Sequence, residues 1–222
     1  MQCGQRDACG RASLYVSPMT DPCGWLVAHG SSCVEVLGFV SGVLCVYLVT
    51  RENIWNWPLG AITAAFYIVV FARAGLYSDT GLQMVYLVLS FYGWWHWLRG
   101  GPQHAAPLRV SRAPAREMLL LGIAGIAMWM LFWRITRMLP GAKAPLLDAA
   151  LVATSLVAQY MMTRKYLENW LLWIAADVLY IGLYFTRGLR LSSLLYAVYL
   201  ALAILGYWQW KRSLLRPSFA SS

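Results

Sequence analysis

The chain has 222 residues, of which 60% are hydrophobic and only 12% are charged, with 12 tryptophans and a mean hydropathy of +0.55. Soluble domains have about 45–50% apolar and about 25% charged residues, so this composition predicts a polytopic membrane protein in a lipid bilayer. A net charge of +9 would suggest nucleic-acid binding in a soluble protein, but here the basic residues fall between apolar runs, and we expect no nucleic-acid partner.

Seven apolar runs are long enough to span a bilayer as helices. The predicted spans are Val34–Val49, Ile54–Phe71, Thr80–Leu98, Glu117–Trp133, Pro145–Met162, Glu168–Phe185 and Leu191–Trp210. A polar linker, Arg99–Arg116, precedes the fourth span. We expect residues 1–33 to be a poorly ordered or interfacial tail without a cleaved signal peptide, and Lys211–Ser222 to be a basic tail. The predicted fold is an all-α membrane protein.

The second half of the chain repeats the first at a distance of 113 residues. Arg51–Trp97 aligns with Arg164–Trp210 without a gap, and 16 of the 47 positions are identical. Because an even number of spans separates equivalent positions, the two three-helix repeats, residues 34–98 and 145–210, are expected to be parallel, with residues 99–144 between them. Some transporters bind their substrate between such repeats. We therefore expect a 3+1+3 arrangement with a site at the repeat interface.

The distribution of charge predicts an orientation, and the cysteines and histidines argue against metal chemistry. Ten lysines and arginines near the membrane lie on the side of the C-terminus and six on the opposite side. This bias predicts a cytoplasmic C-terminus and an external N-terminus.

None of the five cysteines forms a Cys-x-x-Cys pair, and the sequence has no Walker motif. We expect no metal, no cofactor and no enzymatic activity.

Polar and aromatic side chains share one face of the sixth span. Asn169, Trp173, Asp177, Tyr180 and Tyr184 fall within one arc at helical spacing. A carboxylate inside a membrane costs about 2.5–3.5 kcal/mol, so this face is expected to line the bundle interior. The complete predicted substrate site is Asn56, Trp57, Gln83, Tyr86, Asn169, Trp173, Asp177, Tyr180, Tyr196 and Tyr199.

The chemistry of this site predicts the class of its ligand. One acid among aromatic rings suits a flat, delocalised cation, and amides and phenols suit hydroxyl groups or a carboxamide. No lysine or arginine lies inside the second, third, sixth or seventh span. Because phosphate groups normally bind Arg, Lys or a glycine-rich loop, we expect an unphosphorylated ligand.

Several of these residues also have a structural interpretation. Asp177 could instead be a structural acid bonded to a neighbouring helix. Asn56 and Asn169 could bond backbone groups near Pro58 or at helix starts. Most of the tryptophans near span ends could be interfacial anchors; these are Trp94, Trp95, Trp97, Trp208 and Trp210.

Two motifs resemble the signature segments of a known family. The runs Trp55-Asn56-Trp57-Pro58-Leu59-Gly60 and Asn169-Trp170-x-x-Trp173-x-x-x-Asp177 are similar to those of the Pnu vitamin transporters, most closely the nicotinamide riboside branch, PnuC. The resemblance covers about residues 34–212. It implies a fold like that of the SWEET sugar transporters, a homotrimer, facilitated diffusion, and trapping of the riboside by a cytoplasmic kinase.

We therefore expect a bacterial inner-membrane transporter that binds nicotinamide riboside at mid-membrane and alternates access by rocking of its repeats. Another flat vitamin cation such as thiamine remains an alternative substrate. A sugar is a further alternative, if the protein is a carrier like the SWEET transporters. A membrane enzyme and a non-transporting structural or sensor protein are the alternatives from other classes.

Overall fold

In a computed structural model of the chain, the described residues are 33–73, 77–100, 107–138, 145–186 and 190–215. The chain divides into two compact units, residues 1–38 and 39–222. Of the first unit, only the opening turns of one helix belong to the described residues. Residues 1–32 of the predicted N-terminal tail therefore lie outside the described part.

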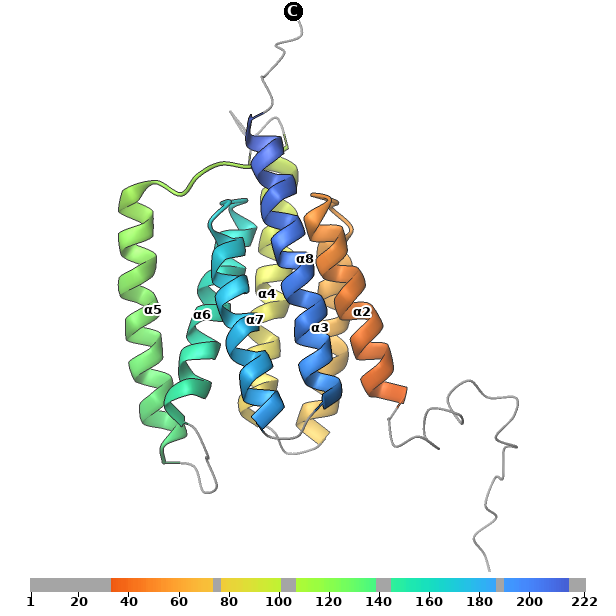
Figure 1. Ribbon diagram of the computed structural model, residues 1–222, viewed down its shortest axis with the longest axis vertical. Helices are drawn as coiled ribbons and strands as arrows, with labels where there is room; N and C mark the ends of the chain where they lie inside the picture. The colour runs from red at the N-terminus through yellow and green to blue at the C-terminus, as the bar shows by residue number, and fades with distance from the viewer. Residues whose placement is uncertain (1–32, 74–76, 101–106, 139–144, 187–189, 216–222) are drawn as a thin grey trace, which may run out of the picture. The chain divides into compact units, whose positions relative to one another are not determined.

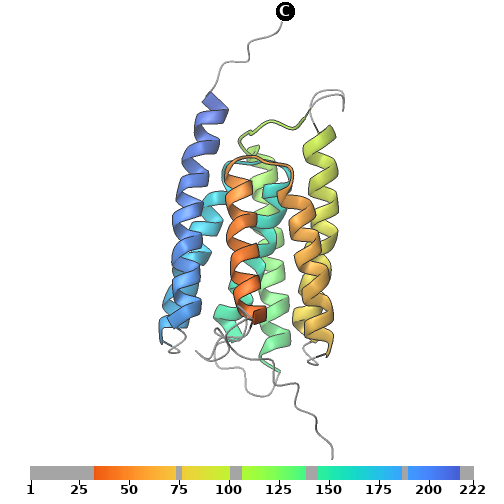
Figure 2. The same cartoon turned by 90° about the vertical axis from the view of Figure 1, so that its right-hand side faces the viewer.

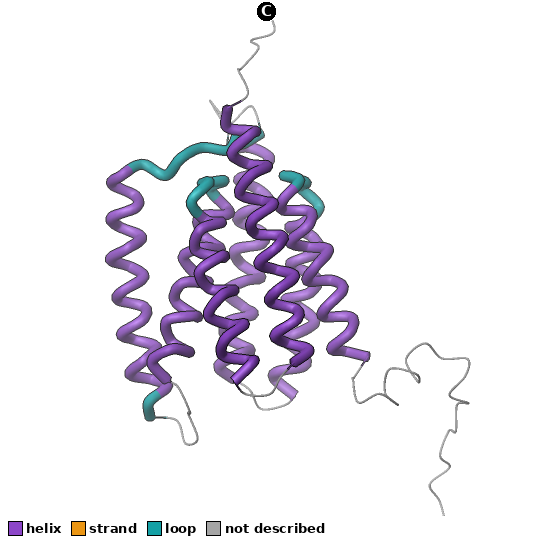
Figure 3. The backbone as a smooth tube through the Cα atoms, viewed as in Figure 1, coloured by secondary structure: helices purple, strands orange, loops and turns teal. Residues whose placement is uncertain are grey.

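The described residues form seven α-helices (Figures 1 and 3). They are α2 (Cys33–Thr50), α3 (Asn56–Arg73), α4 (Tyr77–Arg99), α5 (Ala115–Thr136), α6 (Pro145–Thr163), α7 (Asn169–Thr186) and α8 (Arg190–Leu215). Each coincides with a predicted span to within a few residues, and the all-α fold class is confirmed. α8 continues to Leu215, past the predicted end at Trp210.

Four of these helices are long and apolar enough to cross a membrane. They are α5, α6, α7 and residues Ser193–Leu215 of α8. Two shorter apolar stretches, Val40–Thr50 and Asn56–Val69, are the described parts of α2 and α3 that approach this length. α4 is rich in tryptophan and tyrosine, which lowers its hydropathy. Four candidate spans are enough to support a multi-pass membrane protein.

Within the second unit, helices pack mainly beside their neighbours in the chain. α3 packs along α4, α7 along α8, and α6 contacts both α7 and α4. α2 lies between α3 and α8 (Figure 2), where Cys45 Sγ donates to the carbonyl of Asn56 at 3.4 Å and Gly42 faces the ring of Tyr199. α5 packs chiefly on α6 at one side (Figure 1) and has no buried residue. Its apolar surface suits contact with lipid.

The core contains four tryptophans that are each at most 3% exposed: Trp57, Trp97, Trp170 and Trp210. Trp57 meets Trp97 edge-on with centroids 5.3 Å apart, and Trp170 meets Trp210 edge-on at 5.4 Å. The two pairs are related by the shift of 113 residues seen in the sequence. The same tryptophan geometry therefore recurs in both halves of the chain.

A glycine lies beneath one indole in each pair. A Cβ on Gly93 would lie 2.4 Å from the ring of Trp57, and a Cβ on Gly206 would lie 2.4 Å from the ring of Trp170. These two positions admit only glycine because any side chain would overlap the indole. The identity of Gly93 and Gly206 in the aligned repeats thus has a packing reason.

The interfacial role predicted for tryptophans near the span ends holds for some of them only. Trp95 and Trp208 are 50% and 53% exposed, as membrane-interface residues would be. Trp97 and Trp210 are instead buried, because each indole N–H finds a backbone acceptor inside the protein. For these two residues the interfacial interpretation was wrong.

Candidate functional site

Asp177 lies in the middle of α7 and is only 4% exposed. It is close enough to Tyr196 and Tyr199 of α8 for its charge to act on both phenols. Asn169 and Trp173 precede it on the same helix at intervals of four residues, so all three side chains share a face. The face predicted from sequence is therefore turned into the bundle, at the packing of α7 on α8.

Stacked tyrosines continue this face toward the α7–α8 connection. Tyr180 stacks on Tyr196 with ring centroids 4.4 Å apart and planes 30° apart. Tyr184 stacks on Tyr196 at 5.3 Å and on Tyr180 at 5.8 Å. Tyr199 meets Tyr196 edge-on at 5.7 Å. The predicted residues Tyr180, Tyr196 and Tyr199 thus form one aromatic wall, which Tyr184 extends.

A buried serine joins this wall to the first half of the chain. Ser155 of α6 is 5% exposed, and its hydroxyl lies beside the hydroxyls of Tyr86 on α4 and Tyr180 on α7. Gln83 lies half-buried one turn before Tyr86. Sequence analysis missed Ser155, although a serine in the apolar run of the fifth span was a detectable signal. The site is therefore built from α4, α6, α7 and α8.

The two predicted asparagines begin α3 and α7 in the same way. Asn56 Nδ2 donates to the carbonyl of Asn53 at 2.7 Å, and Asn169 Nδ2 donates to the carbonyl of Tyr166 at 2.5 Å. These bonds are the structural role that we gave as the alternative. Each bond uses one of the two amide N–H groups, so each asparagine keeps one N–H for a ligand, and within the described part of the chain Asn169 also keeps an unpaired Oδ1.

Three polar atoms near Asn169 have no hydrogen-bond partner among the described residues. They are Asn169 Oδ1, Trp170 Nε1 and Trp173 Nε1, all on α7 and all buried, and Trp57 Nε1 on α3 is likewise without a partner. Buried polar atoms are rarely left without a partner, so an acceptor and donors without partners suit a ligand. Trp57 itself is 2% exposed and packs in the tryptophan core on Gly93, so little of its ring is open to a ligand.

A separate apolar pocket of about 320 Å³ lies between α5, α6 and α7. Its walls include Gly122, Trp129, Val157 and Leu172. None of the predicted site residues lines it, and it has no charged side chain. It is therefore distinct from the site around Asp177.

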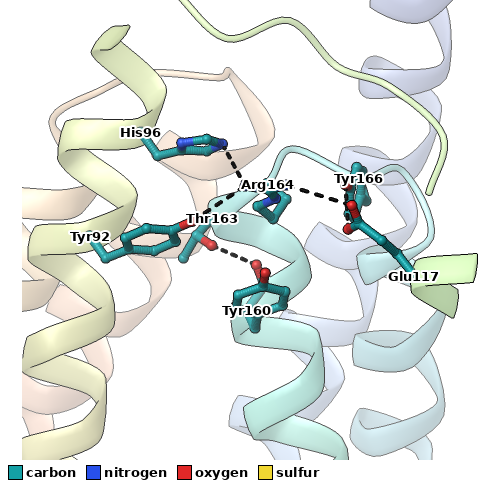
Figure 4. A network of polar contacts seen from close by, with 7 residues as sticks. All are labelled: Tyr92, His96, Glu117, Tyr160, Thr163, Arg164 and Tyr166. Carbon is teal, nitrogen blue, oxygen red and sulfur yellow. Dashed lines mark hydrogen bonds and ion pairs between the residues drawn. The ribbon is translucent and has the colours of Figure 1, made fainter. Parts of the chain in front are cut away.

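A second polar network, which sequence analysis did not single out, surrounds Arg164 after the end of α6 (Figure 4). One guanidinium nitrogen, Nη1, lies 3.4 Å from both the Tyr92 hydroxyl and His96 Nε2, while Nη2 pairs with Glu117 Oε1 at 3.6 Å. The Tyr166 hydroxyl donates to Glu117 Oε2 at 2.6 Å. Burial and this hydrogen bond raise the pKa of Tyr166, so the phenol remains a donor at neutral pH. The network fixes the start of α5 to α4 and α6.

The profile described as nicotinamide mononucleotide transporter matches residues 32–212 of the chain. The nicotinamide riboside transporter PnuC of Escherichia coli K12 is 28% identical over 206 residues, which cover 82% of this chain and 86% of that protein. The riboflavin/roseoflavin transporter RibM of Streptomyces davaonensis is 27% identical, covering 79% of this chain and 83% of its own length.

A solved structure gives the same result. The crystal structure of the vitamin B3 transporter PnuC resembles this fold with a TM-score of 0.65 and 27% sequence identity, covering 85% of this chain and 84% of that one. The family match spans residues 32–212, which is most of the chain. The chain therefore belongs to the nicotinamide mononucleotide transporter family.

Proposed function

We propose that this protein carries nicotinamide riboside across a bacterial inner membrane by facilitated diffusion with alternating access. The observation that carries the proposal is Asp177, a carboxylate that is 4% exposed in an apolar helix and bordered by tyrosines. A pyridinium nucleoside is flat, positively charged and hydroxylated. It would meet both the buried charge and the aromatic wall.

Each side chain has a role suited to one part of this ligand. Asp177 supplies the negative charge, and Trp173, Tyr180, Tyr196 and Tyr199 offer ring faces to the pyridinium. Asn169 accepts a hydrogen bond from the carboxamide or the ribose through Oδ1, which has no partner among the described residues. The remaining predicted polar groups, Asn56, Gln83 and Tyr86, complete the ribose and amide contacts, and Trp57, whose ring packs in the core, can add only its indole N–H.

The substrate is the riboside and not the mononucleotide. Lysine and arginine occur in α3, α4 and α8 only toward the helix ends, and α7 has none. The interior thus offers no cation for a phosphate. The profile's description names the mononucleotide, whereas the E. coli relative is named for the riboside; the absence of interior cations supports the second name.

Riboflavin is a second candidate, favoured by the similarity to RibM. Its ring system is flat and would stack on the same tyrosines, but it carries no positive charge to pair with Asp177. Thiamine, a flat cation, would satisfy the acid, and a neutral sugar would not need it. Dependence on the carboxylate of Asp177 therefore separates cationic ligands from neutral ones.

Three further features belong to this proposal. All seven helices span the membrane as two parallel three-helix repeats joined by α5, an arrangement supported by the matched tryptophan contacts of the two halves. The N-terminus lies outside and the C-terminus in the cytoplasm, where a riboside kinase traps the substrate. The subunits assemble as a homotrimer, each with its own pathway.

Uptake by purified protein in proteoliposomes tests the proposal. Labelled nicotinamide riboside should enter to its external concentration without a proton or sodium gradient, and preloaded unlabelled riboside should accelerate exchange. Excess riboside should compete, whereas mononucleotide, riboflavin, thiamine and glucose should not. A requirement for a gradient would overturn facilitated diffusion. Stronger competition by riboflavin or thiamine than by the riboside would identify that vitamin as the substrate instead.

A further inference from the structure

Beyond the residues that face the substrate, we propose that Glu52 and Lys165 are transport residues. Their ion pair is the latch that closes the pathway at the end of the second unit where α2, α4, α6 and α8 finish. The inference rests on the proposed transport function, but its test reads the latch without any substrate.

The contact joins the turn after α2 to the turn after α6. Lys165 Nζ donates to Glu52 Oε2 at 3.0 Å, and the two side chains are 8% and 24% exposed. The same ammonium lies 4.4 Å from the centre of the Trp97 ring. A lysine this buried is stable only while a carboxylate or an aromatic face replaces its water. The state seen in the structure therefore depends on this contact.

The two partners occupy equivalent positions of the aligned halves. Glu52 and Lys165 are 113 residues apart, the same shift that aligns the halves. Both have a left-handed backbone, with φ of 53° and 52°. Among the described residues they are the only ones other than glycine with positive φ. A contact between equivalent positions must lie where the two halves meet, so neither half alone contains it.

The layer of side chains beside the ion pair also joins the halves. Trp97 of α4 donates its indole N–H to the carbonyl of Met162 at 3.1 Å, and Trp210 of α8 donates to the carbonyl of Val49 at 3.0 Å. The two indole rings touch, with centroids 5.9 Å apart. Charge, ring and backbone contacts thus shut the same end of the interface between the halves.

Movement of one half against the other would break these contacts and spare others. The Trp57–Gly93 and Trp170–Gly206 contacts each lie within one half, so they would move as part of a rigid body. The Glu52–Lys165 pair would separate because its members belong to different bodies. In the open state Lys165 would be exposed to water, and its hydration offsets part of the free energy lost with the ion pair. The contact can therefore form and break repeatedly.

Cys45 is a natural reporter for this opening. Its Sγ donates to the carbonyl of Asn56 at 3.4 Å and lies 3.8 Å from the position of a Cβ on Gly60. It lies in α2 about two turns before Glu52, and Gly42, one turn earlier on the same helix, faces Tyr199 of the second half. In a parent protein in which Cys3, Cys9, Cys23 and Cys33 are serine, a membrane-impermeant maleimide would react with Cys45 alone.

The test compares labelling rates of four variants with this parent in inside-out vesicles and right-side-out vesicles. Glu52→Gln and Lys165→Met should raise labelling from one side only, by about tenfold, the effect of about 1.4 kcal/mol on the closed state. The double variant Glu52→Lys with Lys165→Glu should label at the parent rate, because equivalent backbones allow the pair to re-form over Trp210. Glu117→Gln, which breaks the nearby pair with Arg164, should also label at the parent rate.

Parent-like labelling in both single variants would overturn the latch, as would equal acceleration in the charge-swapped variant. One single variant could fail to fold. The latch is then supported if the charge-swapped variant folds and labels at the parent rate while the other single variant labels faster from one side only. Acceleration from both sides in that other variant would overturn the latch. Riboside uptake by the parent is measured separately. Absent uptake with a side-dependent latch would contradict the proposed substrate and leave the latch standing.

Discussion

Trp97 and Trp210 lie in contact, with ring centroids 5.9 Å apart, and each bonds a carbonyl in the opposite half of the chain. The acceptors, Met162 and Val49, are themselves 113 residues apart, as are the two donors. A pair of reciprocal bonds of this kind makes the two halves interdependent at one end of the interface.

Replacing either tryptophan should therefore have a similar effect. Trp97→Phe and Trp210→Phe should each lower stability by about 1–3 kcal/mol, since each removes one of the two hydrogen bonds that the carbonyl accepts and leaves a smaller ring in the core. Thermal unfolding in detergent measures the change. Trp208→Phe, at a position 53% exposed, serves as the control and should leave Tm unchanged. An effect confined to one of the two core tryptophans would contradict the reciprocal arrangement.

Glycine at two equivalent helix positions should be indispensable. Gly93→Ala and Gly206→Ala each place a methyl group 2.4 Å from an indole carbon, and should cost about 1–3 kcal/mol despite the better helix propensity of alanine. Gly122→Ala, with no atom within 4 Å of the added carbon, should stabilise slightly. The comparison of the three melting temperatures decides this. Equal stabilisation by all three would refute the close packing.

The aromatic wall should act through ring faces and not through hydroxyl groups. Tyr196 stacks on Tyr180 at 4.4 Å and on Tyr184 at 5.3 Å. Tyr196→Phe should keep riboside affinity within a few-fold, whereas Tyr196→Leu should weaken it about tenfold, the loss of one cation–π and stacking contact. Phe185→Leu, at an outward position 73% exposed, is the matched control. The affinities are measured by calorimetry in detergent. Equal affinities for the Phe and Leu variants at position 196 would exclude a role for the ring face.

The network around Arg164 should stabilise the protein without affecting the substrate. Tyr166→Phe removes the 2.6 Å bond to Glu117, and should cost about 1–3 kcal/mol because the carboxylate loses a donor. Riboside affinity should not change, since these residues tie α5 to the bundle. The two quantities are measured on the same preparation by thermal unfolding and calorimetry. A large loss of affinity with unchanged Tm would place the network in the transport pathway.

The helices and the family could be predicted because apolar runs and the motifs around Asn56 and Asp177 are local signals in the sequence. Whether a given tryptophan packs in the core or contacts the substrate could not be predicted, because an inward-facing tryptophan satisfies both interpretations. Trp57 packs on Gly93, whereas Trp173 keeps an indole nitrogen without a partner among the described residues.

The long-range polar contacts were equally hidden. Arg164 meets Tyr92 and Glu117 from other helices only after folding. The Glu52–Lys165 pair was missed as well, although the alignment at 113 residues places opposite charges at these equivalent positions.

Calorimetric titration of nicotinamide riboside into the wild type and Asp177→Asn tests the central claim most directly. The account predicts saturable binding to the wild type, affinity lowered at least about tenfold in Asp177→Asn by loss of the charge pairing, and no binding of the mononucleotide to either. Glu117→Gln, which removes a half-buried acid of the Arg164 network outside the site, should bind like the wild type. Equal riboside affinity in the wild type and Asp177→Asn, or tighter binding of the mononucleotide, would contradict the account.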